Sequence, residues 1–256
     1  MFRKTILALA VLALLVAACG GATPGLSDPK EIVTTGIAAT TGGKSFHIGA
    51  SVDGSLTVPD SGGTFTLDGT TLEADFDIEG GRTHATFAVP ALLGLSGELI
   101  QIGSDQYLKS SLTGPNWMHS AVAAGDITGD VTDPAAALSA ITDLLNTEGV
   151  ETTKLDDTPC GDATCYQVRI TIPADQLAEA GDPTGGMLPA DVFGDGLALT
   201  LLFDRGDNRL AQIATGVDAA DVGSVSVTLT FSNWDESVSI EAPPADQVEE
   251  GGGFSL

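Results

Sequence analysis

The chain has 256 residues, 35 of them acidic and 10 basic, and its formal net charge is −25 at pH 7. Such an acidic chain is disfavoured as a partner of nucleic acid or of an anionic lipid surface. The acidic residues are interspersed with regularly spaced apolar ones, which is typical of a folded, solvated surface and not of a disordered acidic tail.

Residues 1–18 have the layout of a secretory signal peptide. Arg3 and Lys4 precede an uncharged apolar run from Thr5 to Ala18, which is shorter than the roughly 20 apolar residues that span a bilayer. The run ends V-A-A-C-G at residues 16–20, a lipobox pattern in which small residues fit a peptidase and the next thiol accepts a diacylglyceryl group. We expect Cys19 to become the lipid-carrying N-terminus, with fatty acids such as palmitate holding the protein on the outer face of the cell membrane. The alternative is an ordinary cleaved signal with an unrelated cysteine nearby.

Two further cysteines, Cys160 and Cys165, remain in the mature chain, whose 8 basic and 35 acidic residues give a formal charge of −27. A cysteine pair in an oxidising compartment is expected to form a disulfide. The two flank four residues between strand-like stretches, so the bridge would close a hairpin tip. A redox or metal role is disfavoured, because the spacing is not C-x-x-C and no histidine is close in sequence.

The length of the mature chain suits one large domain or two small ones, and no linker divides its middle. We therefore expect a lipidated tether over residues 19–27, a single domain over residues 28–250 and a frayed tail over residues 251–256.

The first part of the domain combines a helix with several strands. Asp28-Pro29 supplies a cap and a first-turn proline, which predicts a helix to about Thr41. Further along, Leu72, Ala74, Phe76 and Ile78 alternate with acidic residues, the pattern of a half-buried antiparallel strand. Similar runs separated by glycine-rich turns predict a meander; they cover residues 46–56, 64–67, 83–89, 99–102 and 106–109.

The second part begins with another helix. Asp133-Pro134 opens a segment whose leucine and isoleucine residues recur at helical spacing and which ends near Gly149. Strand patterns follow at 151–155 and 166–172, and a short helical piece at 174–180 leads into a loop rich in glycine and proline. Three more strands are predicted at 197–203, 209–215 and 225–231.

These elements predict an α+β fold, a large curved antiparallel sheet wrapped around a few helices. About ten strands in one sheet are enough to make it curl, and a curled sheet around helices can enclose an apolar cavity. A filled core is the alternative. The residues expected to line such a cavity come from the alternating strand faces and from the second helix: Phe76, Ile78, Leu199, Leu201, Val227 and Leu229, with Leu138, Ile141 and Leu145.

The sequence carries no motif of a catalytic, metal or nucleotide site. His47, His84 and His119 lie in separate stretches, without a G-x-S-x-G or H-E-x-x-H pattern. We therefore expect no enzyme and no cofactor. Two groups of acids lack the spacing of a calcium loop and are better explained as loop acids and a helix cap: Asp126, Asp130 and Asp133, and the pair Asp191 and Asp195.

Both tryptophans, Trp117 and Trp234, are expected to pack in the core or at its edge, the alternative being that they form ligand platforms.

Several short motifs occur in an order that resembles the actinobacterial LprG/LppX lipoproteins. After the lipobox and the early helix come Lys44-Ser45-Phe46-His47, Tyr107-Leu108-Lys109, Trp117 and the helix at Asp133-Pro134. The ending agrees too, because Phe231-Ser232-Asn233-Trp234 and the segment 238–246 look like the closing strand and the Ala-Pro-Pro-Ala-Asp tail of that family.

The resemblance implies a half-barrel similar to the LolA/LolB carriers, with acyl chains held between sheet and helices. It implies a non-catalytic lipoprotein that binds and transfers an acylated lipid or lipoglycan and works with an envelope transporter. The strong acidity and the pair of Cys160 and Cys165 are departures from the family, so the identity of the ligand does not carry over. Two rivals remain open: an envelope lipoprotein with a closed core that acts as a structural or protein-interaction scaffold, and a hydrolase acting on lipid or cell wall.

Overall fold

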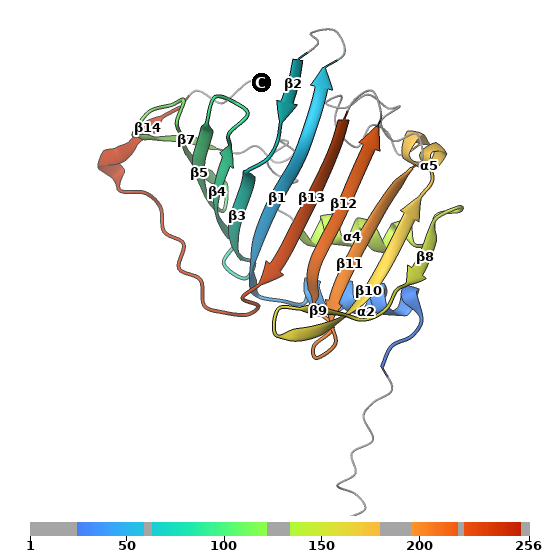
Figure 1. The fold of residues 1–256 in the computed structure, drawn as a ribbon. Coiled ribbons are helices and arrows are strands. Elements are labelled where there is room, and N and C mark those ends of the chain that lie inside the picture. The colour runs from blue at the N-terminus through green and yellow to red at the C-terminus, as the bar shows by residue number, and fades with distance from the viewer. Residues whose placement is uncertain (1–24, 59–62, 122–133, 180–195, 220–222, 252–256) are drawn as a thin grey trace, which may run out of the picture.

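A computed structural model describes residues 25–58, 63–121, 134–179, 196–219 and 223–251 (Figure 1). Three α-helices are present in these ranges, α2 (Pro29–Thr41), α4 (Pro134–Leu144) and α5 (Ala174–Glu179), together with a 3-10 turn at Ala245–Gln247. The strands are β1 (Ser45–Val58), β2 (Gly63–Thr66), β3 (Thr70–Asp77), β4 (Arg82–Val89), β5 (Leu95–Ile102), β6 (Asp105–Ser110), β7 (Trp117–Ala121), β8 (Glu151–Lys154), β9 (Thr158–Cys160), β10 (Ala163–Ile172), β11 (Leu197–Asp204), β12 (Leu210–Ala219), β13 (Gly223–Ser232) and β14 (Val248–Glu250).

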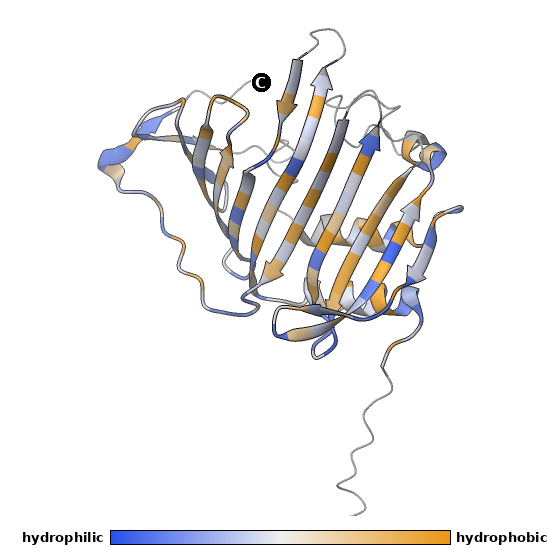
Figure 2. Ribbon diagram, viewed as in Figure 1, coloured by the Kyte–Doolittle hydropathy of each residue, from blue (hydrophilic) through white to orange (hydrophobic). Residues whose placement is uncertain are grey.

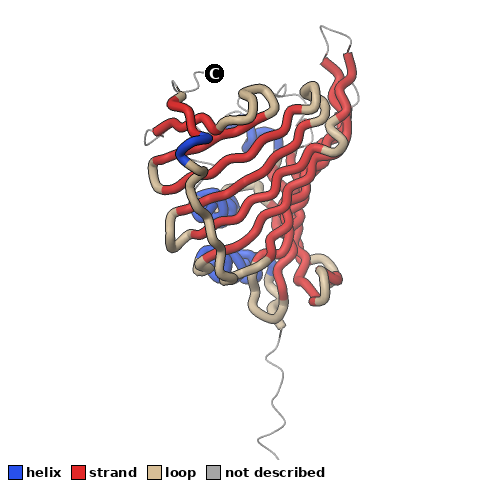
Figure 3. The backbone as a smooth tube through the Cα atoms, turned by 90° about the vertical axis from the view of Figure 1, so that its left-hand side faces the viewer, coloured by secondary structure: helices blue, strands red, loops and turns tan. Residues whose placement is uncertain are grey.

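The described strands form one sheet in the order β14-β7-β6-β5-β4-β3-β1-β13-β12-β11-β10-β8, with β2 on β1 and β9 on β10. Every pair is antiparallel except β14 with β7. Pairing of β1 with β13 joins two meanders from opposite ends of the chain. The sheet curls strongly, with α2 and α4 on one side of it (Figures 1 and 3). The predicted α+β fold with a large curved antiparallel sheet is confirmed.

Helix α2 begins as its sequence predicts. The Asp28 carboxylate accepts a hydrogen bond from the backbone N–H of Glu31 at 2.9 Å, and Pro29 occupies the first turn, where its missing N–H costs nothing. One stripe of the helix is buried against the sheet and α4, and it consists of Ile32, Val33, Gly36, Ile37 and Thr40.

Two residues of this stripe fix how closely α2 approaches the sheet. A Cβ atom on Gly36 would lie 2.2 Å from the Phe203 ring, so only glycine allows this contact. One turn on, the fully buried Thr40 hydroxyl donates to the Gly36 carbonyl at 2.7 Å and accepts from the Leu210 N–H at 2.9 Å. Helix and β12 are thus joined by a hydrogen bond within the core.

One large apolar cluster lies between the sheet and the helices. It includes Phe46, Val168, Leu201 and Phe203 from the strands, with Leu138 and Ile141 from α4 and Leu145 directly after it. Along the strands, apolar and polar residues alternate as orange and blue bands (Figure 2). None of the described helices is long and apolar enough to cross a bilayer.

The structure departs from the sequence predictions at the shortest strands and at both ends of the domain. β7 and β14 were not predicted, because strands of three to five residues give too little alternation to recognise. The predicted tether is packed at its end: Leu26 contacts the main cluster, and its N–H donates to the Tyr166 hydroxyl at 3.0 Å.

Candidate functional site

We call the side of the sheet that carries Phe46, Ile48 and Ala50 the inner face. Ala50 is paired with Leu72 on β3 and Leu229 on β13, and this row continues to Phe87 on β4 and Ile213 on β12. These five side chains are only partly buried. The middle of the inner face is therefore an apolar surface that the described residues leave incompletely covered.

The part of the inner face nearest the start of β1 is filled. The rings of Phe46 and Phe76 stack with centroids 4.9 Å apart, and Trp234 lies 5.0 Å from Phe46. Helix α2 packs on β8, β10, β11 and β12 and on α4, so the helical layer covers the β8–β12 half of the sheet. The inner face is thus covered unevenly. Its side chains are buried near the start of β1 but only partly buried along the row that crosses β12, β13, β1, β3 and β4.

Most of the predicted lining residues belong to this face. Phe76, Leu138, Ile141, Leu145 and Leu201 are buried members of the main cluster.

The remaining four predicted lining residues differ in how far their side chains are exposed. Leu199 and Leu229 are partly buried against the cluster, and Val227 is partly buried opposite Val52. Ile78 departs from the prediction, because β3 ends at Asp77 and the next residue turns outward, its N–H bonded to the Lys44 carbonyl at 2.9 Å and its side chain 41% exposed.

The other predicted sites divide between described and undescribed residues. Cys160 and Cys165 form a disulfide with Cα atoms 5.8 Å apart, closing the β9–β10 hairpin as predicted. Cys19 lies outside the described residues, as do the two groups of loop acids.

All three histidines lie on the opposite, outer face, in one row across the strands. His47 on β1 is paired with Asp75 on β3, which is paired with His84 on β4. The row continues through Ile100 and Tyr107 to His119 on β7. Their placement was not predictable from sequence, because it depends on the register of six strands.

Carboxylates hold both ring nitrogens of His47 and of His119. For His47 they belong to Glu73 and Asp75, each at 2.8 Å, and for His119 to Asp105 at 3.0 Å and Glu250 at 3.1 Å.

These contacts raise the pKa of both histidines. Burial by itself lowers the pKa of His47, but the hydrogen bonds and charges of Asp75 and Glu73 outweigh it, and the pKa lies above 6.5. Hydrogen bonds from its ring to the carboxylates of Asp105 and Glu250 raise the pKa of His119. Imidazoles with both nitrogens engaged are poorly placed to activate a nucleophile. The described residues include no group of three side chains suited to a metal ion.

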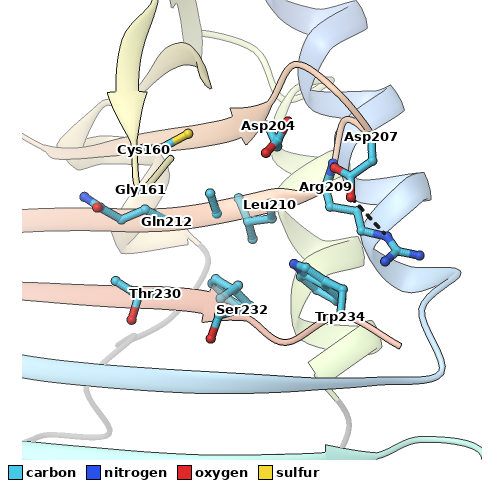
Figure 4. A pocket seen from close by; sticks show the side chains of 12 residues that line it. Cys160, Gly161, Asp204, Asp207, Arg209, Leu210, Gln212, Thr230, Ser232 and Trp234 are labelled. Atoms are coloured by element: carbon cyan, nitrogen blue, oxygen red, sulfur yellow. Dashed lines mark hydrogen bonds and ion pairs between the residues drawn. The ribbon is translucent and has the colours of Figure 1, made fainter. Parts of the chain in front are cut away.

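A depression of about 350 Å³ opens where β12 and β13 diverge beyond the pair Gln212–Thr230 (Figure 4). Arg209 lies over the Trp234 ring at 5.4 Å and pairs with Asp207 and Asp235. A backbone hydrogen bond from Lys44 and then the contact with Arg209 lower the pKa of Asp235. The one cation of the depression is thus already neutralised by two carboxylates.

Sequence reasoning also missed the path of the C-terminal segment. Residues 238–244 form no strand; they cross the outer face, where Ile240 is buried with Ile100 and Trp117. Arg82 donates a hydrogen bond to the Ile240 carbonyl at 3.1 Å. The apolar residues of this segment, Val238 and Ile240, were the available signal. Trp117 and Trp234 both pack against apolar clusters, as predicted.

Comparison with known proteins supports the fold. No protein-family model and no curated protein sequence matches the chain. Among solved structures, LprF from Mycobacterium bovis is similar with a TM-score of 0.55 and 19% sequence identity, covering 86% of this chain and 98% of that chain. The lipoprotein LppX from Mycobacterium tuberculosis is similar with a TM-score of 0.53 and 18% identity, covering 84% and 100%. The resemblance drawn from the sequence is confirmed at the level of the fold.

Proposed function

We propose that the protein is a membrane-anchored lipoprotein of the cell envelope that binds an acylated lipid or lipoglycan on the inner face of its sheet and transfers it without catalysis. The lipobox at Cys19 supports the anchor, and the similarity to the lipoprotein LppX supports the class of protein.

The observation that carries this proposal is the incomplete cover of the apolar row through Leu229, Ala50 and Leu72. A closed core buries its apolar side chains fully, as this one does around Phe46 and Phe203. Acyl chains laid along the row would remove the remaining apolar surface from water. Two chains bury several hundred Å², or roughly 10 kcal/mol at about 25 cal/mol per Å² before ordering costs.

The arrangement of polar groups favours binding over catalysis. The three histidines lie on the outer face, away from the apolar row. A hydrolase would need a base beside the bound lipid, and the described inner face carries mainly aliphatic and aromatic side chains there. Loading by an envelope transporter is part of this proposal, because an acylated lipid does not leave a bilayer spontaneously at a useful rate.

The test is extraction of the purified exported protein with organic solvent, followed by mass spectrometry. A carrier should yield a co-purified acylated lipid in near-stoichiometric amount, including after the detergent used for membrane extraction has been exchanged. Protein that is folded but yields no lipid, and takes up none from vesicles, would instead favour the closed-core scaffold.

A further inference from the structure

Two neighbouring turns at one end of the sheet expose leucine side chains. Leu92 and Leu93, in the turn between β4 and β5, are 57% and 100% exposed, and Leu112, in the turn between β6 and β7, is 76% exposed. We call these three residues the leucine rim. The β4–β5 turn is coloured hydrophobic in Figure 2.

Hydrogen bonds fix the second turn to β5, next to the first turn, and hold the first turn in shape. Ser111 donates its N–H to the Ser96 carbonyl at 2.8 Å, and the Ser111 hydroxyl accepts from the Ser96 N–H at 3.2 Å. Within the first turn, Gly94 donates to the Pro90 carbonyl at 3.1 Å. The leucines therefore project from an ordered backbone.

Folding does not account for a leucine at position 93. Its φ is +54°, in the left-handed region where glycine or asparagine is favoured. Its side chain is fully exposed, so no packing against the described residues offsets this preference. Leu93 thus has an unfavourable backbone conformation and an apolar side chain exposed to water, and such a residue is a candidate for contact with a partner outside the chain.

The charge around the rim indicates what that contact is. In this acidic chain no Asp, Glu, Lys or Arg occurs from Thr83 to Gly97 or from Ser110 to Ala121. Insertion of the three leucine side chains would therefore desolvate no charge carried by either turn itself. The Glu249 carboxylate contacts the second turn, but at Asn116, at the end of the turn next to β7. Three leucines on convex tips also provide far less than the roughly 1,200 Å² of a stable protein–protein interface, whereas a bilayer requires no shape complementarity.

We propose that the leucine rim is a membrane-contact site that inserts into a lipid bilayer. This inference goes beyond the proposed binding of a lipid on the inner face and does not depend on it.

The position of the rim determines which membrane it can reach. β1 runs from the end of the sheet near Leu26 toward the rim (Figure 1), and its 14 residues span about 45 Å. If Cys19 is the anchor, the tether to Ser27 reaches at most about 30 Å. The rim of an upright anchored domain thus faces away from its own membrane, and the site suits contact with a second lipid surface.

The test uses the lipidated protein in donor vesicles of phosphatidylcholine, mixed with acceptor vesicles of the same lipid that carry a fluorescent label. Wild-type protein anchored in donor vesicles should tether the labelled acceptor vesicles to them. Leu93→Ser should weaken this about tenfold, and further replacement of Leu92 and Leu112 by serine should abolish it. Tenfold corresponds to about 1.4 kcal/mol, near the lower value for burying a leucine.

A matched control and a direct probe make the result decisive. Ile78→Ser removes an exposed apolar side chain from a turn at the opposite end of the sheet and should leave binding unchanged. The fluorescence of the tryptophan introduced by Leu93→Trp should be quenched when brominated lipid is present only in the acceptor vesicles. The proposal would be overturned if the wild type does not bind acceptor vesicles, or if the triple serine variant binds them as well as the wild type. A loss of binding with Ile78→Ser equal to that with Leu93→Ser, or an absence of fluorescence quenching, would overturn it too. Extraction of lipid from the same samples reports separately on the inner face.

Discussion

His47 and Asp75 face each other across β1 and β3 on the outer face, with Nδ1 and Oδ1 2.8 Å apart. His119 bridges β6 and β14 in the same manner, through Asp105 and Glu250. Each histidine therefore connects strands by contacts that depend on its charge.

The first prediction is a loss of stability as the pH rises. Because the folded pKa values of His47 and His119 lie above 6.5, their stabilising contribution is complete below the unfolded value. It is lost as the pH rises through the folded values. The free energy of unfolding in urea should therefore decrease from about pH 6.5 upward. His47→Gln with His119→Gln should flatten this dependence, and an unchanged profile would contradict it.

Thr40→Val tests the hydrogen bond between α2 and β12. The substitution keeps the side-chain volume but leaves the buried Leu210 N–H without its acceptor, which should lower the free energy of unfolding by about 1–3 kcal/mol. Thr41→Val is the control: that hydroxyl bonds only within its helix and is partly exposed, so the change should be below about 0.5 kcal/mol. Equal effects in chemical denaturation would exclude a special role for Thr40.

Ala50→Trp and Ala74→Trp compare the open and the filled parts of the inner face. Ala50 is partly exposed in the apolar row. A tryptophan there should occupy the acyl site, leaving Tm nearly unchanged while removing co-purified lipid.

Ala74, by contrast, is 3% exposed beside Ile48 and Ala85. Its enlargement should overpack the core and cost about 1–3 kcal/mol or more. Because Ala74 is buried, Ala50 is the position that tests for an open acyl site. Strong destabilisation at both positions would argue for a core closed throughout.

Reduction of the disulfide between Cys160 and Cys165 should destabilise the protein modestly. The closed loop is short, so the entropy removed from the unfolded chain corresponds to about 2 kcal/mol. Comparison of thermal unfolding with and without reductant measures the effect, provided that alkylation and intact mass confirm a bridge in the exported protein. Two free thiols before reduction would refute the pairing.

The N-terminus of the exported protein should be Cys19 carrying acyl groups. Its intact mass should equal the chain from residue 19 plus a diacylglyceryl group, with or without a further amide-linked fatty acid. Cys19→Ala should prevent both acylation and removal of residues 1–18, which the same measurement detects. A wild-type N-terminus at another residue would show that the lipobox is not used.

The elements that could be predicted from the amino-acid sequence are those whose signals are local. Alternation of apolar and polar residues predicted most strands, because successive side chains of a strand point to opposite faces. Asp28-Pro29 predicted the start of α2, and the spacing of Cys160 and Cys165 predicted a bridged hairpin. Each of these depends on residues that are close in the chain.

Which surfaces are covered depends on contacts between segments that are distant in the sequence. β1 pairs with β13 across more than 160 residues of sequence, and this pairing aligns Leu72, Ala50 and Leu229 into one row. The same alternation of apolar and polar residues is expected for a strand that faces a filled core and for one that faces an open surface. Strand order, register and the position of the helices together determine that Ala74 is covered while Ala50 is partly and Leu93 fully exposed. Strand order and register also align His47 with His119. These arise from contacts between distant segments, which no local pattern encodes.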